Sequence, residues 1–203
     1  MPVSYTIQAE VIDIRRDRPQ INDRFLVDTN VWFWLLYPYA SPLAYQRMFY
    51  PAYISKASSA NAQFYRANLA LAELAHLIER TERDKYNAAQ QLNVAAKEYR
   101  HNYPSEHTNV VTQIQGVWDG VKQIAQMLPA SIDDTAAAAV LARMPTEALD
   151  GYDLFIVEAM VSAGISQVIT DDGDYVTVAG VQVFTANRNV LDQALAQGKL
   201  LVR

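Results

Sequence analysis

The stretch RFLVDTNVWFWLL, residues 24–36, decides the fold prediction. It reads as a short buried strand, FLV, followed by a helix that begins near VWFW and that Pro38 should end. Between the two, Thr29 or Asn30 can act as the N-cap of the helix. Neither role accounts for Asp28, because a carboxylate at the end of a buried strand needs a partner.

Outward from this stretch, short apolar segments alternate with helical ones. A parallel sheet covered on both faces is typical of such a pattern. The expected strands are SYTIQAEVIDI (4–14), FLV (25–27), QFYRA (63–67), LPASI (128–132), QVIT (167–170) and VQVFT (181–185). The expected helices cover 31–37, 41–60 with an interruption at Pro51, 68–80, 82–100 and 110–128, and three more begin near Asp133 or Asp134, Asp150 and Asn189.

The composition is that of an ordinary globular chain of 203 residues, 51% hydrophobic and 19% charged. With no cysteine and only three histidines, disulfides and thiolate sites are excluded, and oxygen ligands for Mg²⁺ or Mn²⁺ are favoured. The net charge of −5 argues against broad nonspecific binding to nucleic acid. The first residues lack an apolar signal segment, and no run of about 18 apolar residues could span a membrane. We therefore expect a cytoplasmic protein.

Several acidic residues are predicted to meet at one edge of the sheet. Asp28 follows the strand FLV, and the turn DDGD (171–174) follows the strand QVIT. Glu73 lies one turn into the helix after QFYRA, and Asp153 lies in the first turn of the helix before QVIT. In open parallel sheets, ligands bind beyond the carboxyl ends of the strands. Carboxylates gathered there, with no lysine or arginine among them, predict a divalent metal that acts on phosphate esters.

Four segments, in this order, resemble the PIN-domain ribonucleases, with the VapC-like toxins as the most similar branch. They are LVDTNVW (26–32), NLALAEL (68–74), LDGYDLFIVEA (149–159) and VITDDGDY (168–175). The resemblance implies a three-layer α/β/α sandwich with a central parallel sheet, and a Mg²⁺- or Mn²⁺-dependent endoribonuclease that hydrolyses RNA. It also implies the role of a toxin with an antitoxin protein as partner. The implied catalytic and metal-binding acids are Asp28, Glu73, Asp153 and Asp172, with Asp174 as an auxiliary metal ligand and with Asn30 and Thr170 as polar support.

Two parts of the chain depart from that pattern. We expect residues 1–23 to be an N-terminal extension and residues 24–203 to be a single PIN-like domain with a helical insertion at about 81–128. Within the insertion, helices at 82–100 and 110–128 should pack as a hairpin. The second carries an apolar stripe that the first cannot cover, so the remaining domain or a second copy of the chain should cover it. Because PIN domains commonly pair, we favour a homodimer, and the alternative is an amphipathic helix of an antitoxin in this groove. The stripe consists of Val110, Ile114, Val117, Val121, Ile124 and Leu128.

Each proposed site residue also has a purely structural interpretation. Each acid could be a cap, turn or surface residue, and Asp150 competes with Asp153 for the third place. His76 is expected to be packed or exposed on its helix and not a ligand. Whether one or two metals bind is open. A degenerate domain that serves as an RNA- or protein-binding scaffold is the alternative function, and a scaffold need not bind Mn²⁺.

Overall fold

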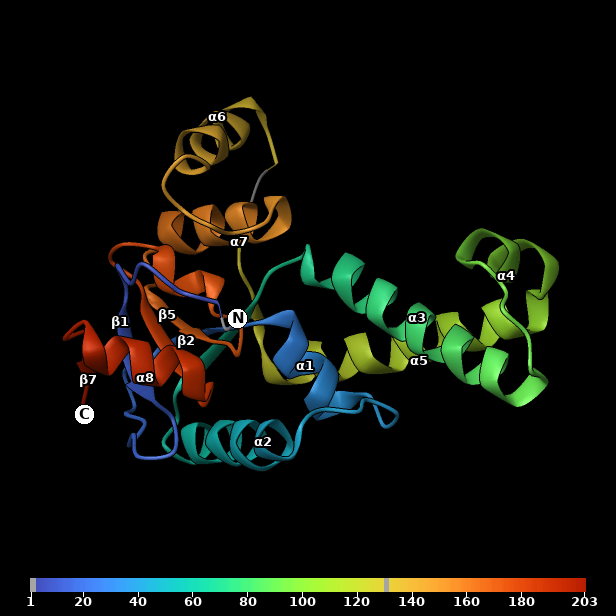
Figure 1. Ribbon diagram of the computed structural model, residues 1–203, viewed down its shortest axis with the longest axis horizontal. Coiled ribbons are helices and arrows are strands. Elements are labelled where there is room, and N and C mark those ends of the chain that lie inside the picture. Colours follow the sequence, from blue (N-terminus) through green and yellow to red (C-terminus); the bar gives the residue numbers. More distant parts are fainter. Residues whose placement is uncertain (1–2, 130–131) are drawn as a thin grey trace.

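The computed structural model describes residues 3–129 and 132–203, and a sheet of seven strands lies at its centre (Figure 1). The strand order is β4-β3-β2-β5-β6-β1-β7, and every pairing is parallel. The predicted α/β class with a central parallel sheet is confirmed. The strands are β1 (Glu10–Asp13), β2 (Arg24–Val27), β3 (Gln63–Arg66), β4 (Gln126–Met127), β5 (Gln167–Ile169), β6 (Gln182–Thr185) and β7 (Leu200–Leu201).

Helices cover both faces of the sheet, because consecutive residues of each central strand face opposite ways. In β2, Leu26 belongs to one apolar cluster, whereas Phe25 and Val27 belong to the other. The first cluster also holds residues of α7 (Gly151–Ser162) and α8 (Arg188–Ala196). The second holds residues of α1 (Thr29–Leu36), α2 (Ala44–Ser59), α3 (Ala70–Gln90) and α5 (Pro104–Ile124). The result is a three-layer α/β/α sandwich, in which α7 and α2 lie on opposite sides of the sheet (Figure 1).

The segment before residue 24 contributes to this sheet. Strand β1 pairs with β6 on one side and with β7 on the other. Arg203, near β7, bonds the carboxylates of Asp17 and Asp23 at 2.9–3.1 Å, which ties the two ends of the chain together. Residues 10–13 are therefore a structural part of the sandwich.

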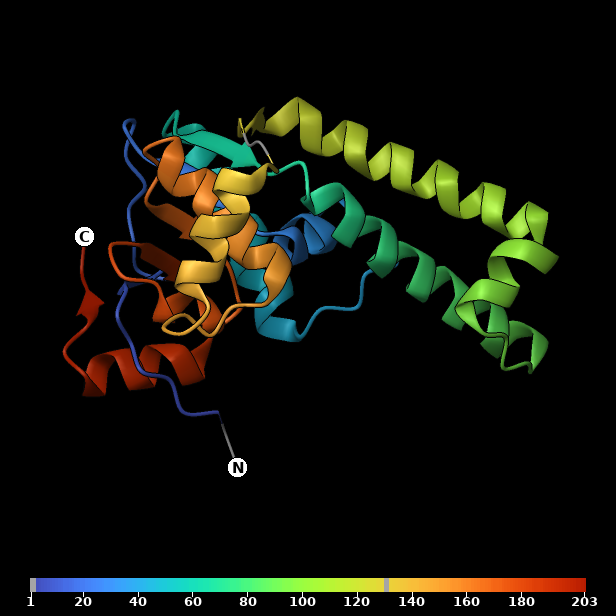
Figure 2. The ribbon, with the colours of Figure 1, turned by 90° about the horizontal axis from the view of Figure 1, so that it is seen from above.

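The predicted hairpin of helices 82–100 and 110–128 is wrong in its first helix. Helix α3 continues for 21 residues, from Ala70 to Gln90, because the segment 81–90 consists mostly of helix-favouring residues. It ends at Gln91, which has a left-handed φ of 55°. Its antiparallel partner is α5, and the short α4 (Ala96–Asn102) lies at the tip of this arm, which projects from the sandwich in both views (Figures 1 and 2).

The apolar stripe of α5 is covered largely by the chain itself. Four of its six residues are buried: Val110, Val117, Val121 and Leu128. Ile114 is partly buried, and Ile124 is exposed. This removes the reason for which a second copy was expected, and the homodimer stays a prediction. The strand expected at 128–132 lies earlier, at β4, while residues 130–131 of that prediction lie outside the described residues.

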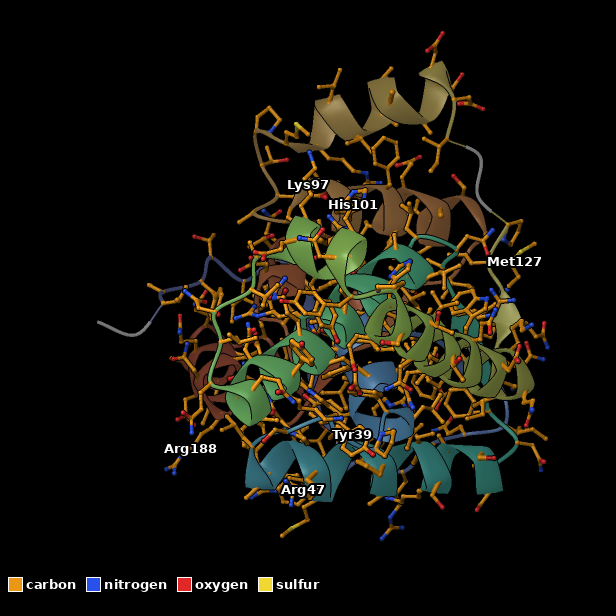
Figure 3. All side chains as sticks on the ribbon, turned by 90° about the vertical axis from the view of Figure 1, so that its right-hand side faces the viewer. Tyr39, Arg47, Lys97, His101, Met127 and Arg188 are labelled. Atoms are coloured by element: carbon orange, nitrogen blue, oxygen red, sulfur yellow. The ribbon has the colours of Figure 1, made fainter. Side chains whose placement is uncertain are left out.

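Two further details complete the fold. Helix α2 runs through Pro51 without the expected interruption, and α6 (Asp134–Arg143) packs on α7 from outside. Across residues 3–129 and 132–203, the structure has no helix whose length and apolar character would allow it to cross a membrane. Figure 3 views the molecule from the end of the arm: Lys97 and His101 of α4 appear in the upper half of this view, whereas Tyr39 and, in α2, Arg47 appear in the lower half.

Candidate active site

Four acids from four separate elements line one pocket at the carboxyl edge of the sheet. Asp28 follows β2, Glu73 lies in the first turn of α3, Asp153 lies in the first turn of α7, and Asp172 lies just after β5. The pocket has a volume of about 290 Å³. We call it the acid pocket, and it is lined by Asp28, Thr29, Asn30, Glu73, His76, Leu77, Asp150, Tyr152, Asp153 and Asp172.

The partner of Asp28 is a neutral hydroxyl from a distant part of the chain. Asp28 is buried, and its Oδ2 accepts a hydrogen bond of 2.7 Å from Thr170 Oγ1. Asp28 itself occupies the N-cap position of α1 but makes no side-chain capping bond, so the prediction of Thr29 or Asn30 as N-cap is wrong. The carboxylate is bonded to Thr170 instead, and Asp28 also lines the acid pocket.

Two partly buried acids, Glu73 and Asp153, are held in the same manner. The hydroxyl of Thr29 donates to Glu73 Oε2, and the hydroxyl of Tyr175 donates to Asp153 Oδ1 at 2.8 Å. Among residues 3–129 and 132–203, no lysine, arginine or histidine forms a salt bridge with any of the four acids. Their negative charge is therefore not offset by a side-chain cation.

Asp172 and Asp174 have different positions. The backbone N–H of Asp172 donates to Thr170 Oγ1 at 2.9 Å, so the same hydroxyl connects the first and fourth acids. Asp172 Oδ1 accepts from the N–H of Asp174 at 2.9 Å. Asp174 begins a 3-10 helix, η1 (Asp174–Thr177), and is not among the residues that line the acid pocket. The structure thus brings the four main acids together, but not the proposed auxiliary ligand.

Asp150, the rival third acid, also lines the pocket but has a clear structural task. Its Oδ1 caps α7 by accepting from the N–H groups of Tyr152 and Asp153, at 2.9 and 3.0 Å. Asp153 is more deeply placed and is held by Tyr175. The geometry therefore separates a capping residue from one whose carboxylate faces the other acids.

Three pocket features were missed in the sequence. Tyr175 is the aromatic end of the segment VITDDGDY, but its hydroxyl contact with Asp153 is set by tertiary structure. His76 is exposed on α3, as expected, and it also lines the pocket three residues after Glu73, a spacing that places both on one helix face. Tyr152 lines the opening and is half exposed.

The comparisons with known proteins give a fold. No protein-family model and no curated protein matches the sequence. A chain in the crystal structure of VapBC2 from Rickettsia felis, bound to a DNA fragment from their promoter, matches with a TM-score of 0.50. The match covers 80% of this chain and 98% of that chain, at 11% sequence identity. The fold is PIN-like. The predicted three-layer sandwich is confirmed, and at this identity the likeness extends to the fold alone.

Burial and mutual repulsion favour the protonated forms of the acids in the acid pocket. Burial, together with the charges of Asp172 and Glu73, raises the pKa of Asp28 to about 7, although the hydrogen bond from Thr170 acts in the opposite direction. Burial raises the pKa of Asp153 to about 8, with the charge of Asp28 as the next cause. The pKa of Glu73 is also raised, chiefly by burial. Carboxyl groups with raised pKa values bind either protons or a cation.

The donor chemistry of the acid pocket fits Mg²⁺ or Mn²⁺, because its charged donors are all carboxylate oxygens. In the described part of the chain, however, no three acidic or histidine side chains already stand in an arrangement that would hold a metal ion. Each of the three deepest acids is instead turned toward a hydroxyl, so metal binding would require small side-chain movements.

The stability of the metal-free protein should fall as pH rises from about 4 to 8. The folded pKa values of Asp28 and Asp153 lie above the ordinary value of 3.8, so the folded state binds more protons than the unfolded state in this range. Urea unfolding in the presence of a chelator at pH 5, 6.5 and 8 measures the effect. We expect the free energy of unfolding to decline by about 2 kcal/mol or more. A rise over the same range would contradict the buried, repelling cluster.

Proposed function

We propose that this chain is a metal-dependent endoribonuclease that hydrolyses RNA phosphodiester bonds, with Mg²⁺ or Mn²⁺ as its cofactor. One observation carries the proposal: four carboxylates from four distant segments line one pocket without a cationic partner among the described residues. Such a cluster costs stability in the absence of a cation, and metal binding offsets that cost. The PIN-like fold supports the same conclusion.

Asp28, Glu73, Asp153 and Asp172 would hold the ion. When bound, the ion supplies a Lewis acid that activates water and offsets negative charge on the phosphate. The chain's own hydroxyls orient these acids: Thr170 holds Asp28 and Tyr175 holds Asp153. Asn30, His76 and Tyr152 line the same pocket and are the side chains that a nucleotide would meet there.

The structural neighbour also suggests a biological setting. That neighbour is VapBC2 from Rickettsia felis, bound to a DNA fragment from their promoter. By analogy of fold, we propose that this chain is the toxin of a toxin–antitoxin pair and binds an antitoxin protein.

A scaffold function is the second candidate, favoured by one observation. The described acids do not form a ready three-ligand metal site, because hydroxyls already occupy some of their oxygens. A degenerate domain that binds RNA or protein would tolerate this arrangement.

Metal titration followed by a cleavage assay separates the two candidates. Isothermal calorimetry with Mn²⁺ on the chelator-treated protein should show saturable binding, with a larger affinity at pH 8 than at pH 6 because protons compete for the acids. The loaded protein should cleave single-stranded or structured RNA, and chelator should stop cleavage. Absence of Mn²⁺ binding at millimolar concentration would favour the scaffold.

A further inference from the structure

The segment before β1, residues 3–9, lies along α8 and is held by a ladder of side-chain amides; we call it the N-terminal strap (Figure 2). Residues four apart on a helix are separated by about 6 Å, and alternate residues of an extended chain by about 6.8 Å, so the two repeats match. The bonds are Asn189 Nδ2 to Val3 O (3.1 Å), Gln193 Nε2 to Val3 O (2.9 Å), Tyr5 N to Gln193 Oε1 (2.7 Å), Gln197 Nε2 to Tyr5 O (2.9 Å) and Ile7 N to Gln197 Oε1 (3.1 Å).

The strap also contacts the turn that follows β5. The N–H groups of Gln8 and Ala9 donate to the carbonyl of Val176 in η1, at 2.8 and 3.0 Å. Tyr5 precedes Gln8 by three residues, and its ring lies against Gly173. The strap therefore holds both sides of η1, one through backbone bonds and the other through an aromatic ring.

Gly173 is explained by Tyr5 and not by the backbone. Its φ of −73° and ψ of −16° lie in the right-handed helical region, which any residue adopts. A Cβ atom at this position would overlap the Cζ, hydroxyl and Cε1 atoms of the Tyr5 ring. The close approach of the ring is thus the physical reason for a glycine here.

This contact lies directly beside the acid pocket. Gly173 separates Asp172, which lines the pocket, from Asp174, whose N–H holds the Asp172 carboxylate at 2.9 Å. The bond that fixes the fourth acid therefore spans the residue on which Tyr5 rests. The pKa of Tyr5 is raised, chiefly by burial and next by the charges of Asp174 and Asp172, because its hydroxyl lies near these acids.

We infer that Tyr5 is a positioning residue of the acid pocket: by packing on Gly173, it keeps Asp172 in the orientation that binds metal. The N-terminal strap then helps to position a metal ligand of the acid pocket, although it lies outside the motifs that resemble PIN-domain ribonucleases. This inference rests on the proposed metal-dependent function. It adds to that function a residue whose contact can also be measured without any metal.

A double-mutant cycle tests the contact. Gly173→Ala should displace the ring and lower both the melting temperature and the Mn²⁺ affinity. In a Tyr5→Ala background, Gly173→Ala should have almost no further effect, because the atoms that it would strike are gone. Gly116→Ala is the control for added volume without a clash: a Cβ at Gly116 has no neighbour within 4 Å, so the Mn²⁺ affinity should stay at the wild-type value, and the melting temperature should not fall because alanine favours helix α5. If Gly173→Ala is equally harmful in both backgrounds, the contact is rejected.

Mn²⁺ calorimetry on the full chain tests the positioning role. Tyr5→Ala should weaken Mn²⁺ binding about 10-fold, as the loss of a residue that supports a ligand commonly does, whereas Tyr5→Phe should keep the wild-type affinity. If Tyr5→Ala does not fold, Gln193→Ala, which loosens the strap alone, should show the same weakening. A wild-type protein that binds no Mn²⁺ would overturn the proposed function and this role with it. Equal affinity of the wild type and the folded variants would overturn the positioning role alone.

Discussion

Asp28→Asn should abolish Mn²⁺-dependent RNA cleavage while leaving the fold intact. The substitution removes one negative charge from the centre of the acid pocket, and the amide oxygen of Asn can still accept the hydrogen bond from Thr170. We expect a loss in kcat of about 10³-fold, which corresponds to about 4 kcal/mol of transition-state stabilisation. The measurement is a cleavage assay with saturating Mn²⁺ beside thermal unfolding in chelator.

The metal-free variant should melt at the same temperature as the wild type or higher. Burial and neighbouring charges raise the pKa of Asp28 to about 7, so its ionised form opposes folding near neutral pH, and a neutral Asn removes that cost. Asp192→Asn is the control, because Asp192 is an exposed carboxylate of α8 that is not among the residues of the acid pocket. Retained activity in folded Asp28→Asn would reject Asp28 as a metal ligand.

Val117→Asp should unfold the protein. Val117 is only 5% exposed and belongs to the apolar cluster that joins α5 to α1, α2 and the sheet. Burying a carboxylate there without a partner costs about 3–5 kcal/mol, which is a large fraction of the stability of a domain. Circular dichroism and urea unfolding measure the loss.

Val111→Asp is a matched control on the same helix. Val111 is 38% exposed, so the same substitution leaves the new charge in water and should change stability by less than about 0.5 kcal/mol. A folded, monomeric Val117→Asp protein obtained from a dimeric wild type would contradict the structure, because it would show that this face is covered by a second copy. Light scattering of both variants and of the wild type distinguishes these results.

Local chemistry in the sequence was enough to predict the layers and the edge at which the acids meet. Apolar segments such as FLV and QVIT are buried on both faces, and their residues alternate between the two clusters because side chains of a strand point in turn to opposite sides. Once strands are parallel, residues that follow them lie at one edge, which places Asp28 near Asp172. The order of the four acidic motifs therefore predicted which side chains would share a pocket, while their chemical roles stay predictions.

Helix boundaries in the arm could not be obtained in the same way. The segment 81–90 has few apolar residues, so its pattern gave no sign that α3 continues from the pocket toward the tip. Continuity is decided by packing against α5, which lies later in the chain, and by helix propensity summed over many weak contributions.

The sequence by itself determined the fold class, the sheet edge and the set of acids, because those depend on residue type, local period and the parallel connection of strands. Only the tertiary structure decided what each acid touches. Thr170 meets Asp28 across 142 positions of sequence, Tyr175 meets Asp153 across 22, and Tyr5 reaches Gly173 from the other end of the chain. Contacts of this kind depend on how distant segments pack, which no local pattern records, since the same hydroxyl or ring would look ordinary anywhere else in the chain.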